Sequence, residues 1–218
     1  MKKEIPFPFI CLLVSGGHCQ ILLAQAYNKF KVLGETLDDA VGEVYDKISK
    51  IMGYGYPGGP VIEELAKKSN GKYNFDLPKP LLKEKTLNLS FSGLKTAVRR
   101  IIEKGINNSQ KYDLANEFQN VITECLLKKV DSTFKLINKK FKIYNFILSG
   151  GVASNEYIRG KFQLLCTKNQ ISFFAPDKEL CVDNATMIAW AGLEIMKFRK
   201  ISNKVNIPPK PRWRLDSL

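Results

Sequence analysis

The sequence predicts an α/β fold in which helices flank a mixed β-sheet, and three observations support this class. Strand-like apolar runs follow one another near the start of the chain, and later strand-like runs alternate with amphipathic helical segments. Two Ser-Gly-Gly turns, at residues 15–17 and 149–151, each directly follow an apolar run. The 218 residues are 44% hydrophobic, which is sufficient for a sizeable core and excludes a disordered chain.

The first part of the chain contains three predicted strands and a helix. Residues 8–15 and 19–26 are predicted to form two strands joined by a tight turn, and residues 29–37 a third strand. Residues 38–53 are predicted to form a helix, which the Gly- and Pro-rich segment 53–60 ends. The apolar residues at helical spacing in this helix are Val41, Val44, Tyr45, Ile48, Ile51 and Met52.

The remainder of the chain completes one lobe, over residues 1–206, and adds a basic, proline-containing tail at residues 207–218. In the tail, Trp213 stands between two arginines. A helical insertion is expected over about residues 60–142. The predicted helices lie at residues 60–69, 91–104, 112–140, 155–169 and 183–199, and the predicted strands at residues 144–151 and 171–176.

The charge is strongly basic and unevenly distributed. The formal net charge is +13, yet residues 1–60 carry six Lys or Arg and six Asp or Glu. Residues 61–142 carry 17 basic and 9 acidic side chains, and residues 143–218 carry 11 and 6. Such an excess favours a polyanion as partner, RNA or DNA first. A lysine-rich solvated surface would give the same composition.

The composition also bears on the compartment. No apolar run approaches the roughly 18 residues that span a bilayer, so no membrane association is expected. Pro6 and Pro8 interrupt the opening segment, which argues against a signal peptide. Five cysteines without a CxxC pair are typical of reduced thiols in a cytoplasmic protein.

One glycine motif is misleading. Gly53, Gly55 and Gly58 match the pattern GxGxxG. That pattern binds dinucleotides only where it follows a strand and opens a helix. Here it follows a predicted helix and contains Pro57, so a Rossmann fold is rejected. The sequence also has no GxxxxGK[ST] motif of a P-loop.

The two Ser-Gly-Gly turns indicate a nucleotide site. Glycines let a phosphate approach the backbone, where turn N–H groups can surround it, and Ser15 and Ser149 could each add a hydroxyl. If their strands share a sheet, both loops open on one edge and could hold one nucleotide from two sides. This is the arrangement of the actin-like ATPase fold. A plain hairpin turn is the alternative for either loop alone.

Five sequence blocks carry a resemblance to a known family. They are "LLVSGGHCQI", "GETLDDAVGEVYDKISKIMGYGYPGGP", "SFSGLKTA", "SGGVASN" and "CVDNATMIAWAG", in this order over residues 8–192. Together they resemble the tRNA N(6)-adenosine threonylcarbamoyltransferase family, formerly described as O-sialoglycoprotein endopeptidase or glycoprotease. The resemblance implies an actin-like ATPase architecture related to Hsp70 and sugar kinases.

The resemblance covers only the second lobe of the family and its tail. Family members carry an HxxxH metal motif in an N-terminal lobe, whereas this sequence contains one histidine, His18. We therefore expect the isolated chain to lack transferase activity, as a fragment, a split-gene product or a truncated relic.

The resemblance implies a substrate role for eight residues. The first loop would bind threonylcarbamoyl-AMP through backbone amides, Asp46 would accept hydrogen bonds from ligand hydroxyls, and Asn155 would contact the nucleoside. Gly59 would let the ligand lie against the backbone. The alternatives are a solvated helix position for Asp46, ordinary turn chemistry for Gly59 and a helix N-cap for Asn155. The eight residues are Leu13, Val14, Ser15, Gly16, Gly17, Asp46, Gly59 and Asn155.

The family's carboxylate metal ligand corresponds to Asp183. Its place before the last predicted helix also suits an N-cap, and without HxxxH the capping role is favoured. Val182 and Cys19 replace threonines that are usual in these blocks. His18 is interpreted as a loop histidine, and a nucleophilic Cys19 is disfavoured because His18 would be its sole partner base.

The block "SFSGLKTAVRR" offers hydroxyls and cations for phosphate contact, on tRNA or in a partner interface. Lys95 and Arg99 lie four residues apart and so on one helix face. A solvated basic face is the alternative. The residues concerned are Ser90, Ser92, Lys95, Arg99 and Arg100.

The family resemblance implies the transfer of threonylcarbamoyl from threonylcarbamoyl-AMP to N6 of the adenosine 3′ of the anticodon in tRNA. It also implies a divalent metal (iron first, with zinc or magnesium as alternatives), a paralogous actin-like subunit and, in bacteria, a small ATPase. A non-catalytic relic that binds nucleotide or a partner lobe is one alternative. An actin-like kinase or ATPase is another, although it leaves "SFSGLKTA" and "CVDNATMIAW" unexplained.

The older peptidase description finds no support, because the sequence has neither a zincin helix nor a catalytic dyad. Since an actin-like lobe buries a face against its sister lobe, we expect exposed apolar side chains on the first hairpin or the last helix.

Overall fold

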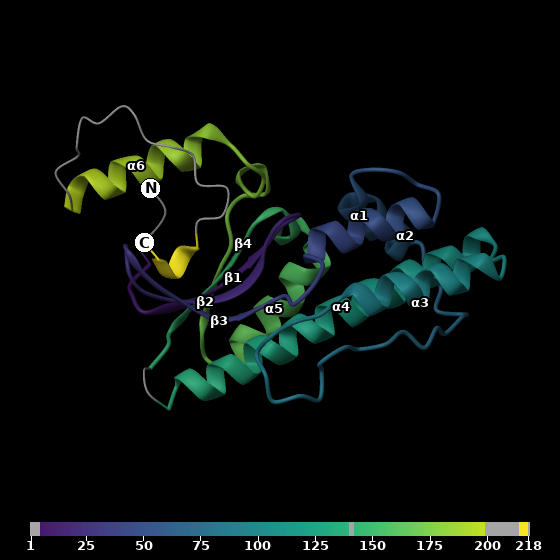
Figure 1. Ribbon diagram of the computed structural model, residues 1–218, viewed down its shortest axis with the longest axis horizontal. Helices are drawn as coiled ribbons and strands as arrows, with labels where there is room; N and C mark the ends of the chain where they lie inside the picture. The colour runs from purple at the N-terminus through teal and green to yellow at the C-terminus, as the bar shows by residue number, and fades with distance from the viewer. Residues whose placement is uncertain (1–4, 140–141, 199–213, 218) are drawn as a thin grey trace.

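The computed structural model describes residues 5–139, 142–198 and 214–217, and a five-stranded mixed sheet forms its centre (Figure 1). The order across the sheet is β3-β2-β1-β4-β5. β1, β2 and β3 form an antiparallel meander, whereas β4 and β5 run parallel to β1. The predicted five-stranded mixed sheet is confirmed. The strands are β1 (Phe9–Val14), β2 (Cys19–Ala26), β3 (Lys29–Glu35), β4 (Asn145–Ser149) and β5 (Ser172–Phe174).

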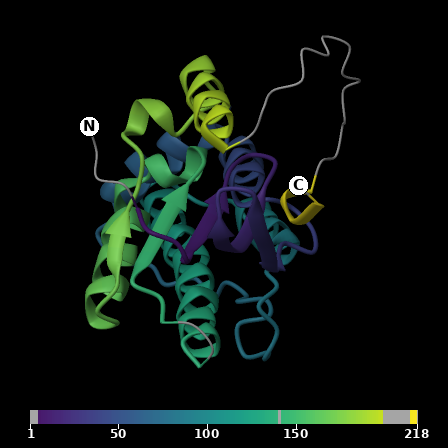
Figure 2. The same ribbon diagram turned by 90° about the vertical axis from the view of Figure 1, so that its left-hand side faces the viewer.

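Helices cover one face of this sheet. Ile10 in β1 pairs with Phe146 in β4, and both side chains are fully buried. The ring of Phe146 packs against Phe134 of α4 at 5.6 Å and against Phe162 of α5 at 5.3 Å between centroids. α4 and α5 therefore close the core, while α6 lies on the other side of the sheet (Figures 1 and 2). The helices are α1 (Val41–Ile51), α2 (Gly58–Lys67), α3 (Ser92–Glu103), α4 (Asn108–Ile137), α5 (Glu156–Lys168) and α6 (Ala185–Phe198).

Every predicted helix is present, but four of the six begin two to four residues from the expected position, at Val41, Gly58, Asn108 and Ala185. α2 begins at Gly58, inside the segment that was expected only to end the preceding helix. A helix, α1, and not a strand directly precedes this segment, so the rejection of a Rossmann motif holds. α4 begins at Asn108 and not at residue 112, because Asn107 and Gln110 form a reciprocal capping box.

Two buried charged residues of α4 hold the long connection between α2 and α3. The Asp113 carboxylate accepts hydrogen bonds from the Ser69 hydroxyl at 2.6 Å and from the N–H groups of Asn70, Gly71 and Tyr73. Lys129 Nζ donates to three backbone carbonyls further along the connection. A segment that looks irregular in sequence is thus fixed by specific bonds. The three carbonyls belong to Leu81, Glu84 and Thr86.

α6 leaves its apolar side chains exposed, as was expected for the last helix. Ile188 is 67% exposed and Trp190 is 58% exposed, although both are large and apolar. On the first hairpin the effect is weaker, since Phe9, Cys11 and Leu13 are half-buried.

The lobe boundary at residue 206 and the extended tail stay predictions. Trp213 and Arg212 lie outside the described residues, and Arg214 forms an ion pair with Asp216. Within the described ranges, no helix combines the length and hydropathy needed to cross a bilayer.

Candidate functional site

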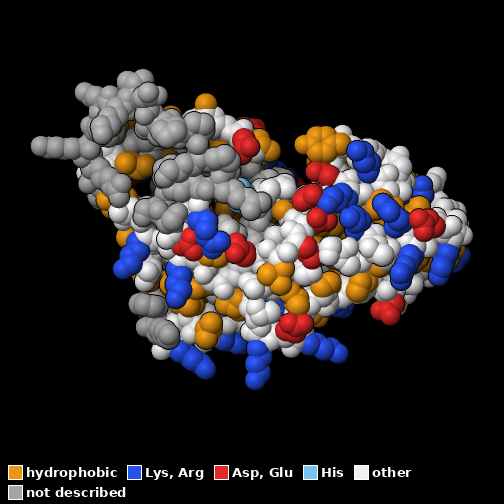
Figure 3. Space-filling model, viewed as in Figure 1, with side chains coloured by type: hydrophobic (Ala, Val, Ile, Leu, Met, Phe, Trp, Pro, Cys, Tyr) orange, Lys and Arg blue, Asp and Glu red, His pale blue; other side chains and the backbone are white. Residues whose placement is uncertain are grey.

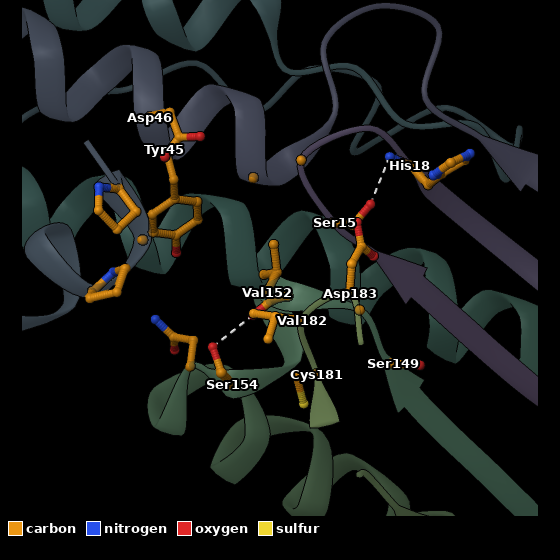
Figure 4. Close-up of a pocket in the computed structure, with 18 of the residues that line it drawn as sticks. Ser15, His18, Tyr45, Asp46, Ser149, Val152, Ser154, Cys181, Val182 and Asp183 are labelled. Carbon is orange, nitrogen blue, oxygen red and sulfur yellow. Dashed lines mark hydrogen bonds between the residues drawn. The ribbon is translucent and has the colours of Figure 1, made fainter. Parts of the chain in front are cut away.

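A pocket of about 550 Å³ lies where β1 and β4 end, side by side and parallel (Figure 4). Both Ser-Gly-Gly loops form part of its wall, because parallel neighbours end on the same edge of a sheet. The prediction that the loops open on one edge is confirmed. The loop residues on the wall are Ser15, Gly16, Ser149, Gly150 and Gly151.

The first loop is shaped by its serine. Ser15 Oγ accepts hydrogen bonds from the N–H groups of Gly17 at 3.2 Å and His18 at 3.0 Å. The Ser15 N–H donates to the His18 carbonyl at 2.8 Å, which closes the turn. The Gly42 N–H donates to the Ser15 carbonyl at 3.1 Å, so this loop is attached to the start of α1. Ser15 is therefore a structural residue of the turn, with its hydroxyl proton still available to a ligand.

The second loop requires glycine where it meets the first strand. Gly150 has φ of +93°, and a Cβ there would lie 2.3 Å from the Val14 carbonyl oxygen. Only glycine allows this contact and this conformation. At Gly16 and Gly151, in contrast, a Cβ would meet nothing within 4 Å. These two positions leave open space in the pocket beside the backbone.

α1 and α2 supply a further wall, which contains Asp46 and Gly59. Asp46 Oδ1 accepts a hydrogen bond from the Gly58 N–H at 2.7 Å. The alternative of an ordinary solvated position for Asp46 is therefore wrong. Gly59 is the second residue of α2, so the alternative of turn chemistry is wrong as well. A Cβ on Gly59 would also meet nothing within 4 Å.

Asn155 lies on the pocket wall, but its side chain is engaged by the fold. Its Oδ1 accepts from the Ile158 N–H at 2.9 Å, which caps α5. Its Nδ2 donates to Gln119 Oε1 at 3.0 Å, and the residue is 6% exposed. The N-cap interpretation is confirmed, and the nucleoside contact stays a prediction.

The pocket brings together most of the predicted substrate residues, and also Asp183. Val14 is fully buried within β1, so its side chain does not reach the pocket. Gly17 is exposed in the turn and is not part of the wall. The predicted residues on the wall are Leu13, Ser15, Gly16, Asp46, Gly59, Asn155 and Asp183.

Asp183 does not cap α6. The Met187 N–H donates to Asn184 Oδ1 at 2.9 Å, so Asn184 has the capping role and the expected capping by Asp183 is wrong. As for a metal, no three His, Cys, Asp or Glu side chains converge anywhere in the described parts of the chain. Asp183 offers a single carboxylate, and the described residues do not by themselves constitute a metal site.

The side chain of Cys19 is unsuited to nucleophilic attack. It is 1% exposed, and burial raises its pKa to about 12, although a hydrogen bond with the Val41 backbone opposes this. A thiol with this pKa is protonated at neutral pH. The disfavoured nucleophile is therefore excluded, while His18 lies on the pocket wall.

The serines of "SFSG" have a structural partner that the sequence did not reveal. Ser90 Oγ and Ser92 Oγ both donate to Asp38 Oδ2, at 2.5 and 2.8 Å, and the Phe91 N–H donates to Asp38 Oδ1. Partial burial opposes ionisation of Asp38, but these hydrogen bonds outweigh it and lower its pKa. The expectation that these hydroxyls contact phosphate is therefore not supported. Arg99 and Arg100 are exposed on α3, and phosphate contact by the cations stays a prediction.

Two further residues organise the pocket without having been predicted. Glu63 lies on the wall, and its Oε1 accepts from the N–H of Glu156 at 2.8 Å, at the start of α5. Arg159 donates to the Ala153 carbonyl, to the Pro176 carbonyl and to Cys181 Sγ, and so joins the second loop to the segment before α6. No local sequence signal distinguishes either residue, because their partners lie outside their own helices, 6 to 22 residues away for Arg159 and 93 residues away for Glu63.

Comparison with known proteins gives a consistent result. A family model described as tRNA N6-adenosine threonylcarbamoyltransferase matches residues 1–190. Proteins of that name from Wolbachia pipientis and Pelagibacter ubique are 42% and 43% identical over 219 residues. These alignments cover 100% of this chain but 64% and 61% of the two relatives. The chain thus spans less than two thirds of the length of these relatives.

A solved structure supports the fold. Full-length HypF, in a phosphate- and nucleotide-bound form, aligns with a TM-score of 0.59 at 13% sequence identity. The alignment covers 88% of this chain and 34% of HypF. At this identity the similarity concerns the fold alone, and the predicted actin-like α/β arrangement is confirmed.

Proposed function

The chain belongs to the tRNA N6-adenosine threonylcarbamoyltransferase family, and we propose that it supplies the nucleotide-binding lobe of a tRNA-modifying transferase. In this proposal the pocket holds threonylcarbamoyl-AMP, and the activated group passes to N6 of the adenosine 3′ of the tRNA anticodon. With tRNA as the proposed substrate, the proposed location of the protein is the cytoplasm.

The observation that carries the proposal is the convergence of the two Ser-Gly-Gly loops on one pocket. Its volume of about 550 Å³ is in the range of small-molecule sites. Gly16 and Gly151 leave open space beside the backbone, where a phosphate could lie against turn N–H groups. Glycines on a pocket wall are expected where a ligand approaches the main chain.

The reaction follows from the chemistry of the proposed ligand. The N6 amine of adenosine attacks the carbonyl carbon of the threonylcarbamoyl group and forms a C–N bond. The bond from this carbon to the phosphate oxygen breaks, AMP leaves, and the amine loses a proton. The contribution of this chain is to hold the departing AMP, with the loops at the phosphate, and Asp46 and Asn155 nearer the ribose and base.

A metal and protein partners also belong to the proposal. Asp183 would be this chain's ligand to a divalent metal, with iron as the first candidate, and further ligands would have to come from outside the described residues. A paralogous actin-like subunit and a small ATPase are the proposed partners. The exposed apolar residues of α6, such as Ile188 and Trp190, are suited to packing against a further lobe.

Calorimetric titration of the chain with AMP tests the proposal. We expect saturable binding to the wild type and a loss of about tenfold or more in the pocket variant Gly151→Val. Gly160→Val is the matched control, because Gly160 is also open but lies on α5 away from the pocket. Absence of AMP binding at millimolar concentration, or equal affinity in both variants, would contradict the proposal.

A transfer assay with threonylcarbamoyl-AMP and unmodified tRNA tests the second half of the proposal. We expect no product with the chain alone, and product when the N-terminal segment of a full-length relative is added. With ATP added to the same mixtures, ATP hydrolysis without transfer under both conditions would favour an actin-like ATPase instead.

A further inference from the structure

Three lysines lie over tyrosine rings at the end of the molecule where α1 ends and α4 begins. The distances from Nζ to the ring centroid are 5.4 Å for Lys111 and Tyr54, 5.8 Å for Lys68 and Tyr112, and 5.5 Å for Lys72 and Tyr73. We call these six residues the lysine–tyrosine surface. Lys and Arg side chains gather at this end, on the right in Figure 3.

The three pairs form one continuous surface. Lys111 Nζ donates to the Met52 carbonyl at 3.0 Å, which joins the start of α4 to the end of α1. Lys111 and Tyr112 are consecutive residues of α4, so the pair of Lys111 with Tyr54 and the pair of Lys68 with Tyr112 are neighbours. Asp113, the next residue in α4, binds the N–H of Tyr73 at 2.9 Å and so places the third pair beside the other two.

The surface keeps its positive charge. Lys68, Lys72 and Lys111 form no ion pair among the described residues, whereas Lys67 next to them is paired with Glu64 at 2.7 Å. Asp113 is the acidic residue beneath the surface, but it is 2% exposed and is occupied by four donors. A ligand at the surface therefore meets three lysines without an ion pair and their ring faces, with the exposed ion pair of Glu64 and Lys67 beside them.

The surface is connected to the pocket by a short stretch of chain. Two residues after Tyr54, Tyr56 is 79% exposed and lies on the wall of the pocket, together with Pro57. From the pocket mouth outwards, the chain thus presents an exposed aromatic ring, then a tyrosine with a lysine, and then two further lysine–tyrosine pairs. Surfaces that bind single-stranded nucleic acid combine such aromatic rings, which stack on bases, with cations that bind phosphates.

We propose that Tyr56 and the lysine–tyrosine surface bind the single-stranded part of the RNA substrate next to the base that enters the pocket. Tyr56 stacks on a base at the pocket mouth, and Lys68, Lys72 and Lys111 bind the phosphates that follow. RNA bases in loops are recognised in this way, because unpaired bases can be splayed out and stacked on aromatic side chains. This proposal rests on the proposed function, which requires an adenosine of an RNA loop to reach the pocket.

The proposal is tested with a fluorescent RNA hairpin that has the sequence of a tRNA anticodon stem-loop. Its affinity is measured by anisotropy at several salt concentrations for the wild type and for Lys68→Ala/Lys72→Ala. The control is Lys29→Ala/Lys31→Ala. It removes two exposed lysines from β3, a strand that contributes no residue to the lysine–tyrosine surface. We expect the first variant to lose about five- to twentyfold in affinity and to reduce the salt slope by about 1–2, and the control to change less than twofold.

Stacking is tested separately with Tyr56→Ala and Tyr56→Phe. The alanine variant is expected to bind the RNA hairpin about fivefold more weakly or worse, whereas the phenylalanine variant keeps the ring and stays within twofold of the wild type. Tyr56 is mostly exposed, so neither variant should lower the unfolding temperature. Equal affinity of both Tyr56 variants would overturn the stacking role.

The proposed RNA-binding role of this surface would be wrong if both double-lysine variants lost RNA affinity equally. It would also be wrong if the wild type bound AMP but no RNA. A third contradicting result is that Lys68→Ala/Lys72→Ala keeps its RNA affinity but loses binding to a protein subunit of the transferase. AMP titration of the same proteins separates this result from the proposed function. Lys68→Ala/Lys72→Ala should bind AMP as the wild type does, and a wild type that binds no AMP would instead contradict the proposed function.

Discussion

The Gly58 N–H donates a 2.7 Å hydrogen bond to Asp46 Oδ1, and this bond fixes the start of α2 against α1 at the pocket wall. The close approach depends on Gly58, because a Cβ there would lie 2.3 Å from the Tyr45 carbonyl oxygen. At Gly59, the next residue, a Cβ would meet nothing within 4 Å. Gly58 is thus required by the packing of α2 on α1, whereas Gly59 leaves space in the pocket.

We predict opposite effects for alanine at these two positions. Gly58→Ala should lower the free energy of unfolding by about 2–4 kcal/mol, because backbone atoms must move to remove the clash. Gly59→Ala should leave it unchanged or raise it by up to about 1 kcal/mol, since alanine favours helix. It should nevertheless weaken AMP binding severalfold, by occupying ligand space. Urea denaturation and AMP titration measure these changes, and equal destabilisation by both variants would contradict the structure.

Asp113 should make stability sensitive to acid. Hydrogen bonds from Ser69 and from the N–H groups of Tyr73, Gly71 and Asn70 lower its pKa below the ordinary value of 3.8, against the effect of desolvation. Its stabilising contribution is therefore complete above that value and is lost as the pH falls through the lower native pKa.

Asp113→Ala should cost about 2–4 kcal/mol at pH 7, because four donors lose their acceptor. Denaturant unfolding at pH 7 and at about pH 3 measures this difference. The gap between wild type and variant should shrink on acidification, and a gap that does not depend on pH would argue against an ionised Asp113.

The thiol of Cys19 should be unreactive in the folded chain. Burial raises its pKa to about 12, so its thiolate is scarce at pH 8. Iodoacetamide at pH 8, followed by peptide mass spectrometry, should modify Cys19 in urea but leave it free in buffer. Cys19→Ala should bind AMP as the wild type does. Rapid modification in buffer would show that β2 opens readily or that the thiol is activated.

α6 should be a site of association. The apolar side chain of Ile188 is 67% exposed, so Ile188→Glu replaces an apolar surface group without disturbing the core. We expect an unchanged unfolding temperature and reduced self-association or partner binding in sedimentation. Exposed Gln163→Glu on α5 is a control for the added charge. A wild type that sediments as a soluble monomer and gains no stability from the N-terminal lobe would contradict this expectation.

The sequence predicted local features well, but it did not predict hydrogen bonds between residues that are far apart along the chain. Hydrophobic periodicity placed α1, and glycine chemistry placed both pocket loops, because these signals lie within a few residues. The partners of Asp38, Glu63 and Asp113 lie 40 or more residues away along the chain. Asp183 was assigned as a cap from its position, whereas the choice between it and Asn184 depended on backbone geometry.

The central claim is that both Ser-Gly-Gly loops bind one nucleotide, and amide chemical shifts test it most directly. In ¹⁵N spectra recorded during an AMP titration, the N–H signals of Gly16 in the first loop, and of Gly150 and Gly151 in the second, should shift together. All three should follow one saturable curve with a single Kd, while Gly71 and Gly105 outside the pocket should not move. Shifts confined to one loop, or no saturable shift in either loop, would contradict the account.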